Sequence, residues 1–429
     1  MNQNVLLLQG QIGPFFGRFA RDLQAGGYTV YKLNFNGGDE FCYRGPNPIA
    51  YTGRPEAFGD YLRDLLRRLD IGRIYLFGDL RTHHETALHL ARQMGLRAFV
   101  FEEGYLRPDY LTLEENGVNA HSSLPRDPGF YRSRSPLPAL KPVRVPHGFL
   151  YMAAWAMTYY IASALKRRRY PHYRHHRPLN VWGEGGKWLL GYLLKAVHLL
   201  RGRALMSRLL ARHANRYFVV PLQVHCDGQI LRHSRFGAVS LFIEEVIASF
   251  AGHAPPDAVL VIKHHPMDRA YSDYDRQIRA LAATHGLHNR VCYAHDLHLP
   301  TLLDHARGTV VINSTVGLSS LQHGTPVIAL SQAVYNFPGM THQGPLDDFW
   351  RHPGRVDTDL LHDFTAHLLR HNQVNGSFFR RLPGAQTHCG AHFPAEMREH
   401  LLASGPQSAA AAASLPDALS ARVGWAASD

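Results

Sequence analysis

Cysteine is scarce in this sequence, and the paired spacings that cysteine-based sites require are absent. The 429 residues contain four cysteines, Cys42, Cys226, Cys292 and Cys389. Zinc sites and redox-active disulfides usually place two cysteines two residues apart, and no such pair occurs here. Scattered cysteines are typical of reduced thiols, so we expect a cytoplasmic protein.

Two phosphate-binding signatures are also missing, GxxxxGK[ST] and GxGxxG. Their absence disfavours a kinase, an ATPase or a dinucleotide-dependent enzyme, and we expect no cofactor. The N-terminus reads MNQNVLLLQGQIGPFFGRF. It lacks the basic segment and the small-residue cleavage site of a secretory signal peptide.

Acidic residues are outnumbered, which restricts the class of partner. Lys and Arg total 46 and Asp and Glu total 34, so the formal charge is +12. A basic chain favours nucleic acid, anionic lipid or phosphorylated substrates. The basic residues concentrate in KRRRYPHYRHHR, residues 166–177, without the interleaved aromatic platform of RNA-binding domains. We therefore expect an anionic membrane surface and no nucleic acid.

Apolar strand-like runs alternate with helical patterns in two parts of the chain. This alternation predicts an α/β protein with two Rossmann-like domains. We expect them to face each other across a cleft, as in type B glycosyltransferases, with a helical insertion between them. The predicted bounds are 1–146 for the N-terminal domain and 215–385 for the C-terminal domain. The Ala/Ser-rich residues 386–429 are predicted to be a low-complexity tail.

The predicted insertion, residues 147–214, combines apolar, aromatic and basic residues. It begins with HGFLYMAAWAMTYYIASAL and continues into a second long helical run after the basic cluster. Its tyrosines and the basic second helix disfavour a membrane-spanning segment, which needs about 20 apolar residues. Two interpretations stay open: a helical hairpin at a membrane surface, or a buried pair of helices between the domains.

Acidic and glycine-rich stretches follow strands of the N-terminal domain. Glu102 and Glu103 end a predicted strand, and Gly104 lets the chain turn there. Neighbouring residues on a strand point to opposite sides, so one glutamate is expected to face the site as a base or a substrate anchor. The loops GPFFGRF and NFNGGDEF are candidates for an acceptor pocket, with Arg18 available to an anionic group.

Basic and hydroxyl side chains follow strands of the C-terminal domain. Lys263, His264, His265 and Pro266 end one strand, and Asn313, Ser314 and Thr315 connect another strand to a helix. Backbone N–H groups, hydroxyls and the helix dipole together favour an anion, so this pair of loops predicts a phosphate-binding site. The simpler alternatives are a turn with a surface histidine and an ordinary helix cap.

The stretch PLQVHCDGQILRHSRF, residues 221–236, holds four potential metal ligands, His225, Cys226, Asp227 and His233. A metal site is disfavoured, because no second ligand pair supports it. Asp227 is instead a candidate nucleophile or a simple turn residue.

Several ordered motifs together resemble a known family. They include LQGQIGPFF, NFNGGDEF, FEEGYLRPDYLTLEENGVN, PLQVHCDGQILRHSRF, IKHHPMDR, NSTVGLSSLQHGTPVIAL and GMTHQGPLDDFW. From about Leu7 to Trp350, the chain resembles bacterial capsule-polysaccharide transferases of the KpsS/KpsC (LipB/LipA) type, and the S type more closely. The middle helices and the tail do not match that pattern.

The resemblance implies a retaining, metal-independent β-Kdo glycosyltransferase that uses CMP-β-Kdo as donor. The expected acceptor is an anionic lysophosphatidylglycerol-type lipid at the inner face of the inner membrane. Further implied partners are a C-type Kdo transferase and the capsule export complex. The alternatives are a C-type elongating transferase, a CMP-sialic-acid transferase, or a non-catalytic export scaffold.

A retaining reaction passes through a covalent intermediate, for which a carboxylate is the usual nucleophile. We assign this role to Asp227, and the role of base to Glu103 with Glu102 as the second choice. Lys263, His265, Ser314 and Thr315 are expected to stabilise the leaving phosphate. His233 and Arg235 are candidates to contact the carboxylate of Kdo.

Overall fold

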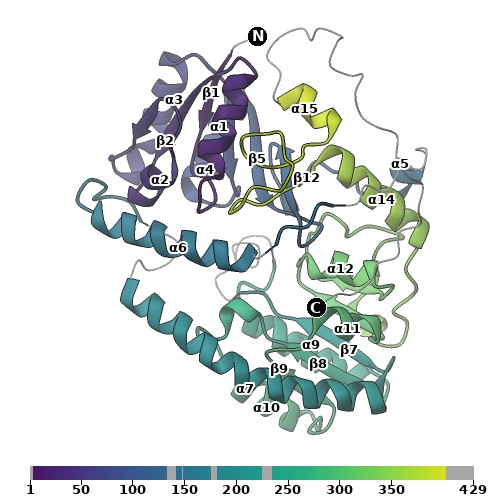
Figure 1. The fold of residues 1–429 in the computed structure, drawn as a ribbon. Helices are drawn as coiled ribbons and strands as arrows, with labels where there is room; N and C mark the ends of the chain where they lie inside the picture. The colour runs from purple at the N-terminus through teal and green to yellow at the C-terminus, as the bar shows by residue number, and fades with distance from the viewer. Residues whose placement is uncertain (1–2, 133–141, 147, 175–180, 225–233, 402–429) are drawn as a thin grey trace. The chain divides into compact units, whose positions relative to one another are not determined.

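The computed structural model describes residues 3–132, 142–146, 148–174, 181–224 and 234–401 (Figure 1). Contacts divide the chain into two compact units. The first comprises residues 1–118, 136–179 and 366–429, and we call it the N-terminal unit. The second comprises residues 119–135 and 180–365, and we call it the C-terminal unit.

The N-terminal unit is built on a seven-stranded sheet of order β12-β6-β5-β4-β1-β2-β3. Strands β1 to β5 pair in parallel, whereas β6 pairs antiparallel with β5 and with β12. The strands are β1 (Asn4–Leu7), β2 (Thr29–Asn34), β3 (Pro48–Ala50), β4 (Ile71–Phe77), β5 (Arg97–Glu103), β6 (Tyr110–Glu115) and β12 (Gln373–Asn375).

Helices cover both faces of this sheet, so its central strands are almost entirely buried. One core joins the strands to α1 and to the C-terminal residues Phe378, Phe393 and Met397. The other core joins them to α3 and α4. The helices are α1 (Phe15–Ala25), α2 (Gly37–Cys42), α3 (Phe58–Arg68), α4 (Thr82–Gln93), α6 (Gly148–Leu165) and α15 (Ala395–Leu401), with the short η1 (Pro55–Ala57).

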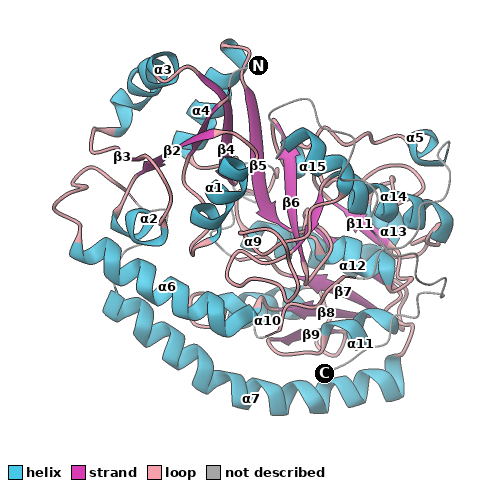
Figure 2. Ribbon diagram, turned by 45° about the horizontal axis from the view of Figure 1, so that its top comes forward, coloured by secondary structure: helices cyan, strands magenta, loops and turns pink. Residues whose placement is uncertain are grey.

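The C-terminal unit is built on a five-stranded, all-parallel sheet of order β11-β10-β7-β8-β9 (Figure 2). Its strands are β7 (Tyr217–Pro221), β8 (Val259–Lys263), β9 (Val291–Ala294), β10 (Gly308–Val311) and β11 (Val327–Ala329). Its helices are α5 (Pro128–Arg132), α7 (Val181–His213), α9 (Val239–His253), α10 (Asp275–Thr284), α11 (Leu299–Asp304), α12 (Val316–Gln322) and α13 (Leu346–Phe349), with η2 (Asn119–His121) and η3 (Pro266–Asp268). Helix α14 (Thr358–His371) spans the boundary with the N-terminal unit.

The structure confirms the predicted α/β class with two units built on parallel strands. It differs from the predicted bounds at the C-terminal end, because β12, which lies within the predicted 215–385 domain, pairs with β6 in the N-terminal sheet. Residues 386–401 are not a low-complexity tail, since Cys389, Phe393 and Met397 are buried in the N-terminal core. A three-residue strand and isolated apolar residues carry too little periodicity to be recognised. Residues 402–429 lie outside the described residues.

The predicted insertion forms two helices, and they belong to different units. Helix α6 packs on α2 in the N-terminal unit, and α7 packs on the sheet of the C-terminal unit. No helix within the described ranges is both long enough and apolar enough to cross a membrane.

Candidate functional site

The carboxyl end of β5 presents two adjacent glutamates to different surroundings. The Glu102 Oε1 atom accepts a hydrogen bond from the Glu103 backbone N–H at 3.0 Å. Glu103 instead accepts from Gln11 Nε2 at 3.2 Å and forms an ion pair with Arg107 at 3.4 Å. The alternation of a strand explains this separation, since neighbouring side chains point to opposite faces.

The two glutamates also differ in their electrostatics. Burial raises the pKa of Glu102 to about 7, opposed by the hydrogen bond from the Glu103 N–H and reinforced by the nearby Glu103 and Asp79 carboxylates. A carboxyl group with a pKa near neutrality can both accept and release a proton under physiological conditions. Glu102 therefore has the proton affinity of a general base, whereas Glu103 is paired with a guanidinium group.

The NFNGGDEF loop packs against a helix, where the sequence predicted part of an acceptor pocket. A Cβ added to Gly37 would lie 2.3 Å from the Ala162 carbonyl oxygen, and one on Gly38 would lie 2.5 Å from the Tyr159 ring. Both contacts are too short for any side chain, so the two glycines let α2 and α6 approach closely. Arg18 is partly exposed and donates to the Phe378 carbonyl at 3.4 Å, so its predicted role toward an anionic group stays a prediction.

A buried polar network, which the sequence did not reveal, holds α6 against the carboxyl ends of β1 and β2. Gln9 Nε2 lies 3.1 Å from both Asp39 carboxylate oxygens, and Tyr159 Oη donates to Asp39 at 2.9 Å. Asn36 Nδ2 donates to Tyr159 Oη at 2.7 Å. Such a network fixes one arrangement of its side chains, because breaking any bond leaves a buried polar group unpaired. Only the GGD spacing marked this region in the sequence.

In the C-terminal unit, Lys263 and His264 lie at the end of β8, where their side chains are buried. Lys263 is 7% exposed and His264 is 1% exposed. Burial lowers the pKa of Lys263 to about 8, with Asp296 opposing and Arg269 reinforcing that shift. The His264 Nδ1 atom lies 2.7 Å from Tyr293 Oη, and burial lowers the pKa of this histidine.

His265 is the partly exposed member of this group and has a defined tautomer. Its Nδ1 atom accepts a hydrogen bond from the Met267 backbone N–H at 3.2 Å and caps η3, in which Pro266 is the first residue. A neutral imidazole that accepts at Nδ1 carries its proton on Nε2. His265 is therefore a hydrogen-bond donor at the carboxyl-terminal edge of the sheet.

The second predicted loop follows β10, which is the other neighbour of the central strand β7. Gln223 Nε2, beyond the end of β7, donates to Asn313 Oδ1 at 3.1 Å and so links the two strand ends. Ser314 Oγ accepts from the Val316 N–H at 3.2 Å, and Thr315 is the N-cap residue of α12 without a side-chain capping bond. Asn313, Ser314 and Thr315 are all partly exposed. The sheet order therefore places both predicted loops at strands that flank β7.

Arg235 lies at a separate pocket of the C-terminal unit, where it forms an ion pair with Glu245. The pocket has a volume of about 500 Å³ and is lined mainly by α9, β11 and the loop that includes His342 and Gln343. The ion pair offsets the charge that Arg235 was predicted to offer to a sugar carboxylate.

Asp227 and His233, together with His225 and Cys226, lie outside the described residues. Their predicted roles as nucleophile, sugar contact or metal ligands therefore stay predictions. Within the described ranges, no cluster of three or more His, Cys, Asp or Glu side chains has a geometry suited to a metal ion.

Comparisons with known proteins identify relatives over most of the chain. The sequence profile of the family described as capsule polysaccharide biosynthesis protein matches residues 73–379. The capsule polysaccharide export protein KpsS of Escherichia coli is 41% identical over 374 residues, which cover 87% of this chain and 96% of that protein. The capsule polysaccharide modification protein LipB of Neisseria meningitidis serogroup A is 40% identical over 387 residues, which cover 89% of this chain and 92% of that protein.

Among solved structures, KpsC of Thermosulfurimonas dismutans, described as a beta Kdo 2,7 transferase, is similar with a TM-score of 0.42 and 16% identity. The match covers 86% of this chain and 92% of that chain. A beta Kdo 2,4 transferase of KpsC from the same organism has a TM-score of 0.39 and 14% identity, with 85% of this chain and 90% of that chain covered.

Proposed function

The chain belongs to the capsule polysaccharide biosynthesis protein family, and from this premise we propose that it is a retaining glycosyltransferase. It moves β-linked Kdo from CMP-β-Kdo onto a lysophosphatidylglycerol-type lipid, which starts the linker of a capsule polysaccharide. The observation that carries the proposal is the carboxyl group of Glu102, whose pKa of about 7 suits it to deprotonate an acceptor hydroxyl.

The donor binds at the carboxyl-terminal edge of the sheet in the C-terminal unit. In open α/β sheets, ligands bind beyond the carboxyl ends of the strands. His265 supplies an N–H donor there, and Ser314 and Thr315 supply hydroxyl groups. Hydrogen-bond donors of this kind stabilise the charge that develops on a leaving phosphate. Lys263 and His264 are buried, so they hold the strand end in place and do not contact the donor directly.

The reaction proceeds through two displacements. A carboxylate oxygen of Asp227 attacks the anomeric carbon of Kdo, the bond to the phosphate breaks, and CMP leaves with the electron pair. The acceptor oxygen then attacks the same carbon, its proton passes to Glu102, and the ester to Asp227 breaks. Two inversions give net retention. Asp227 comes six residues after the end of β7, the strand between the two donor loops.

The acceptor is anionic and lipid-bound, which agrees with the composition of the chain. The formal charge is +12, and the exposed side chains of α6 and α7 include Leu150, Leu165, Leu193 and Leu200. A protein with apolar side chains exposed beside basic residues binds at the surface of an anionic membrane. We place the enzyme at the cytoplasmic face of the inner membrane, beside a C-type Kdo transferase and the export complex.

The transfer reaction tests this proposal directly. Purified protein is incubated with lysophosphatidylglycerol and CMP-Kdo generated in place, and the lipid is analysed by mass spectrometry. We expect the mass to increase by one Kdo residue, with and without a metal chelator. The variant Asp227→Asn is expected to lose transfer, whereas Asp257→Asn, at an exposed turn, keeps it.

Other outcomes assign the protein differently. Transfer only to a lipid that already carries Kdo indicates a C-type elongating enzyme, and transfer from CMP-sialic acid indicates a sialyltransferase. An absence of transfer from either donor to any of these acceptors indicates a non-catalytic role in export. Normal activity of Asp227→Asn removes this residue as the nucleophile.

A further inference from the structure

Helix α7 has one face held tightly on the C-terminal unit. A Cβ added to Gly202 would lie 1.9 Å from the Asp296 carbonyl oxygen, so only glycine fits at this contact. Leu205 and Leu209 pack into the core below β7, β8 and β9. The ring of His198 stacks on His295 with centroids 4.0 Å apart. These contacts fix the rotation of α7 about its axis.

A second anchor lies one turn or more toward the N-terminus of α7. Arg269 donates to the Gly191 carbonyl at 3.3 Å and forms a two-bond ion pair with Asp296 at 2.5 and 3.1 Å. The side chains of this pair are only 10% and 11% exposed. Asp296 takes part in both anchors, which hold α7 at Gly191 and again from His198 to Leu209.

The opposite face of α7 exposes large apolar side chains at helical spacing. Leu190, Leu193, Val197 and Leu200 are 50%, 62%, 45% and 68% exposed. Their spacing of three, four and three residues places them in one stripe, which we call the outer stripe. With the inner face anchored, α7 cannot rotate this stripe inward. The exposed leucines are therefore a fixed feature of the surface.

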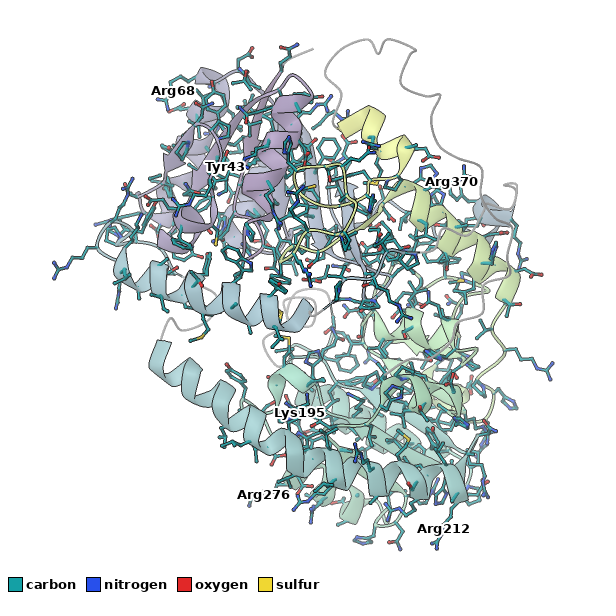
Figure 3. All side chains as sticks on the ribbon, viewed as in Figure 1. Tyr43, Arg68, Lys195, Arg212, Arg276 and Arg370 are labelled. Carbon is teal, nitrogen blue, oxygen red and sulfur yellow. The ribbon has the colours of Figure 1, made fainter. Side chains whose placement is uncertain are left out.

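The side chains of α7 that the structure describes carry positive charge and no negative charge. The basic ones are Lys195, Arg201, Arg203, Arg208 and Arg212, of which Arg201 and Arg208 lie beside the outer stripe at helical spacing. Figure 3 labels Lys195 near the middle of the helix and Arg212 near its C-terminal end. None of the ion pairs within the described part of the chain involves Lys195, Arg201 or Arg203.

We propose that the outer stripe of α7 docks the C-terminal unit onto an anionic lipid surface. The leucines enter the boundary between headgroups and acyl chains, while the basic side chains reach the phosphates. A protein partner would need an apolar groove with acidic groups around it. An anionic bilayer offers an apolar interior and negative charge at every point of its surface. This inference rests on the proposed function only for its biological purpose, which is to hold the enzyme where a lipid acceptor lies.

Vesicle flotation of the full chain tests the proposal. Wild-type protein is mixed with phosphatidylcholine vesicles that contain or lack phosphatidylglycerol. We expect binding to the anionic vesicles, and a decrease of about tenfold or more for the double variant Leu193→Glu/Leu200→Glu. The matched control is Leu241→Glu, since Leu241 is also 50% exposed but lies on α9. Circular dichroism checks that each variant is folded.

Each other outcome overturns the proposal. Docking through the outer stripe is excluded if the wild-type protein does not bind anionic vesicles. It is also excluded if the double variant and Leu241→Glu lose vesicle binding equally. A wild-type dimer that the double variant converts to a monomer shows that a second copy covers the stripe. Transfer to a detergent-dispersed acceptor is measured in parallel, because the double variant keeps that activity. If the wild-type protein binds anionic vesicles but transfers no Kdo, the enzyme assignment fails while the docking proposal stands.

Discussion

Each unit places an ionisable group of shifted pKa at the carboxyl end of a strand, and the two groups have opposite charge; Glu102 is partly exposed and Lys263 is buried. Glu102 lies at the carboxyl end of β5 in the N-terminal unit, and Lys263 lies at the carboxyl end of β8 in the C-terminal unit. Burial is the largest cause of both shifts, because it disfavours the charged form. It raises the pKa of Glu102 to about 7 and lowers that of Lys263 to about 8.

The comparison shows how one physical effect suits the two strand ends to different chemistry. The N-terminal unit gains a carboxyl group that binds a proton near neutrality, beside the acidic residues Glu103 and Asp79. The C-terminal unit gains a buried lysine that stays mostly protonated at neutral pH, close in sequence to His265. An acceptor hydroxyl needs the first environment and a phosphate needs the second. Replacing these residues one at a time tests this difference.

Replacement of Glu102 is expected to have the largest effect. Glutamine cannot accept the acceptor proton, so Glu102→Gln should reduce kcat about 10²- to 10⁴-fold. Because the raised pKa keeps Glu102 protonated below about pH 7, wild-type activity should rise as the pH increases through 7. That rise should be absent from the residual activity of the variant. The measurement is kcat against pH with saturating acceptor.

Glu103→Gln is the matched control for this prediction. It removes a carboxylate from the adjacent position and breaks the ion pair with Arg107. We expect it to keep the rise in activity near pH 7. If Glu103→Gln loses that rise and Glu102→Gln keeps it, Glu103 is the base, as the sequence first suggested.

Replacement of His265 should have an intermediate effect on the opposite unit. His265→Ala removes the N–H that we propose donates to the phosphate, and we expect kcat/KM for CMP-Kdo to fall about 10- to 100-fold. His298→Ala is the control, because His298 also caps a helix by accepting a backbone N–H at Nδ1. Loss of a cap affects stability in both variants. Steady-state kinetics with varied CMP-Kdo should show the decrease in kcat/KM in His265→Ala alone. Equal decreases in both variants would mean that His265 acts only as a helix cap.

Replacement of Lys263 should have the smallest effect, which appears in the pH dependence of stability. Its folded pKa of about 8 is below the ordinary value of 10.5, so the unfolded chain binds more protons between these limits. The free energy of unfolding therefore gains a contribution that increases with pH over this window. Lys263→Met should remove roughly 1–2 kcal/mol of that increase, since each pKa unit is worth about 1.4 kcal/mol and relaxation recovers part of it.

Urea unfolding at about pH 7.5 and about pH 10 measures this change in the free energy of unfolding for wild type and variant. Lys195→Met provides the control, because Lys195 is exposed on α7. An unchanged pH dependence in Lys263→Met would show that water reaches this side chain. Of the two groups compared, only Glu102 would then keep a pKa shifted by burial.

The sequence predicted most elements of the fold because their patterns are local. Strand β4 ends in the apolar run 74–77, and α1 repeats its phenylalanines at helical spacing. The same patterns placed Glu102, His265 and Ser314 at strand ends, where the structure finds them. In contrast, β12 has three residues and its partner β6 is about 260 residues earlier in the chain. No local period indicates such a pairing.

By itself, the sequence determined the α/β class, the family and the strand ends that carry polar residues. These depend on periodicity and on ordered motifs. Only the tertiary structure decided which polar side chains are buried. It separated Glu102 from Glu103, placed Lys263 and His264 inside, and used Gly37 and Gly38 to seat α6. The reason is that burial and close approach depend on contacts between distant segments, which set the pKa values and the space at each strand end.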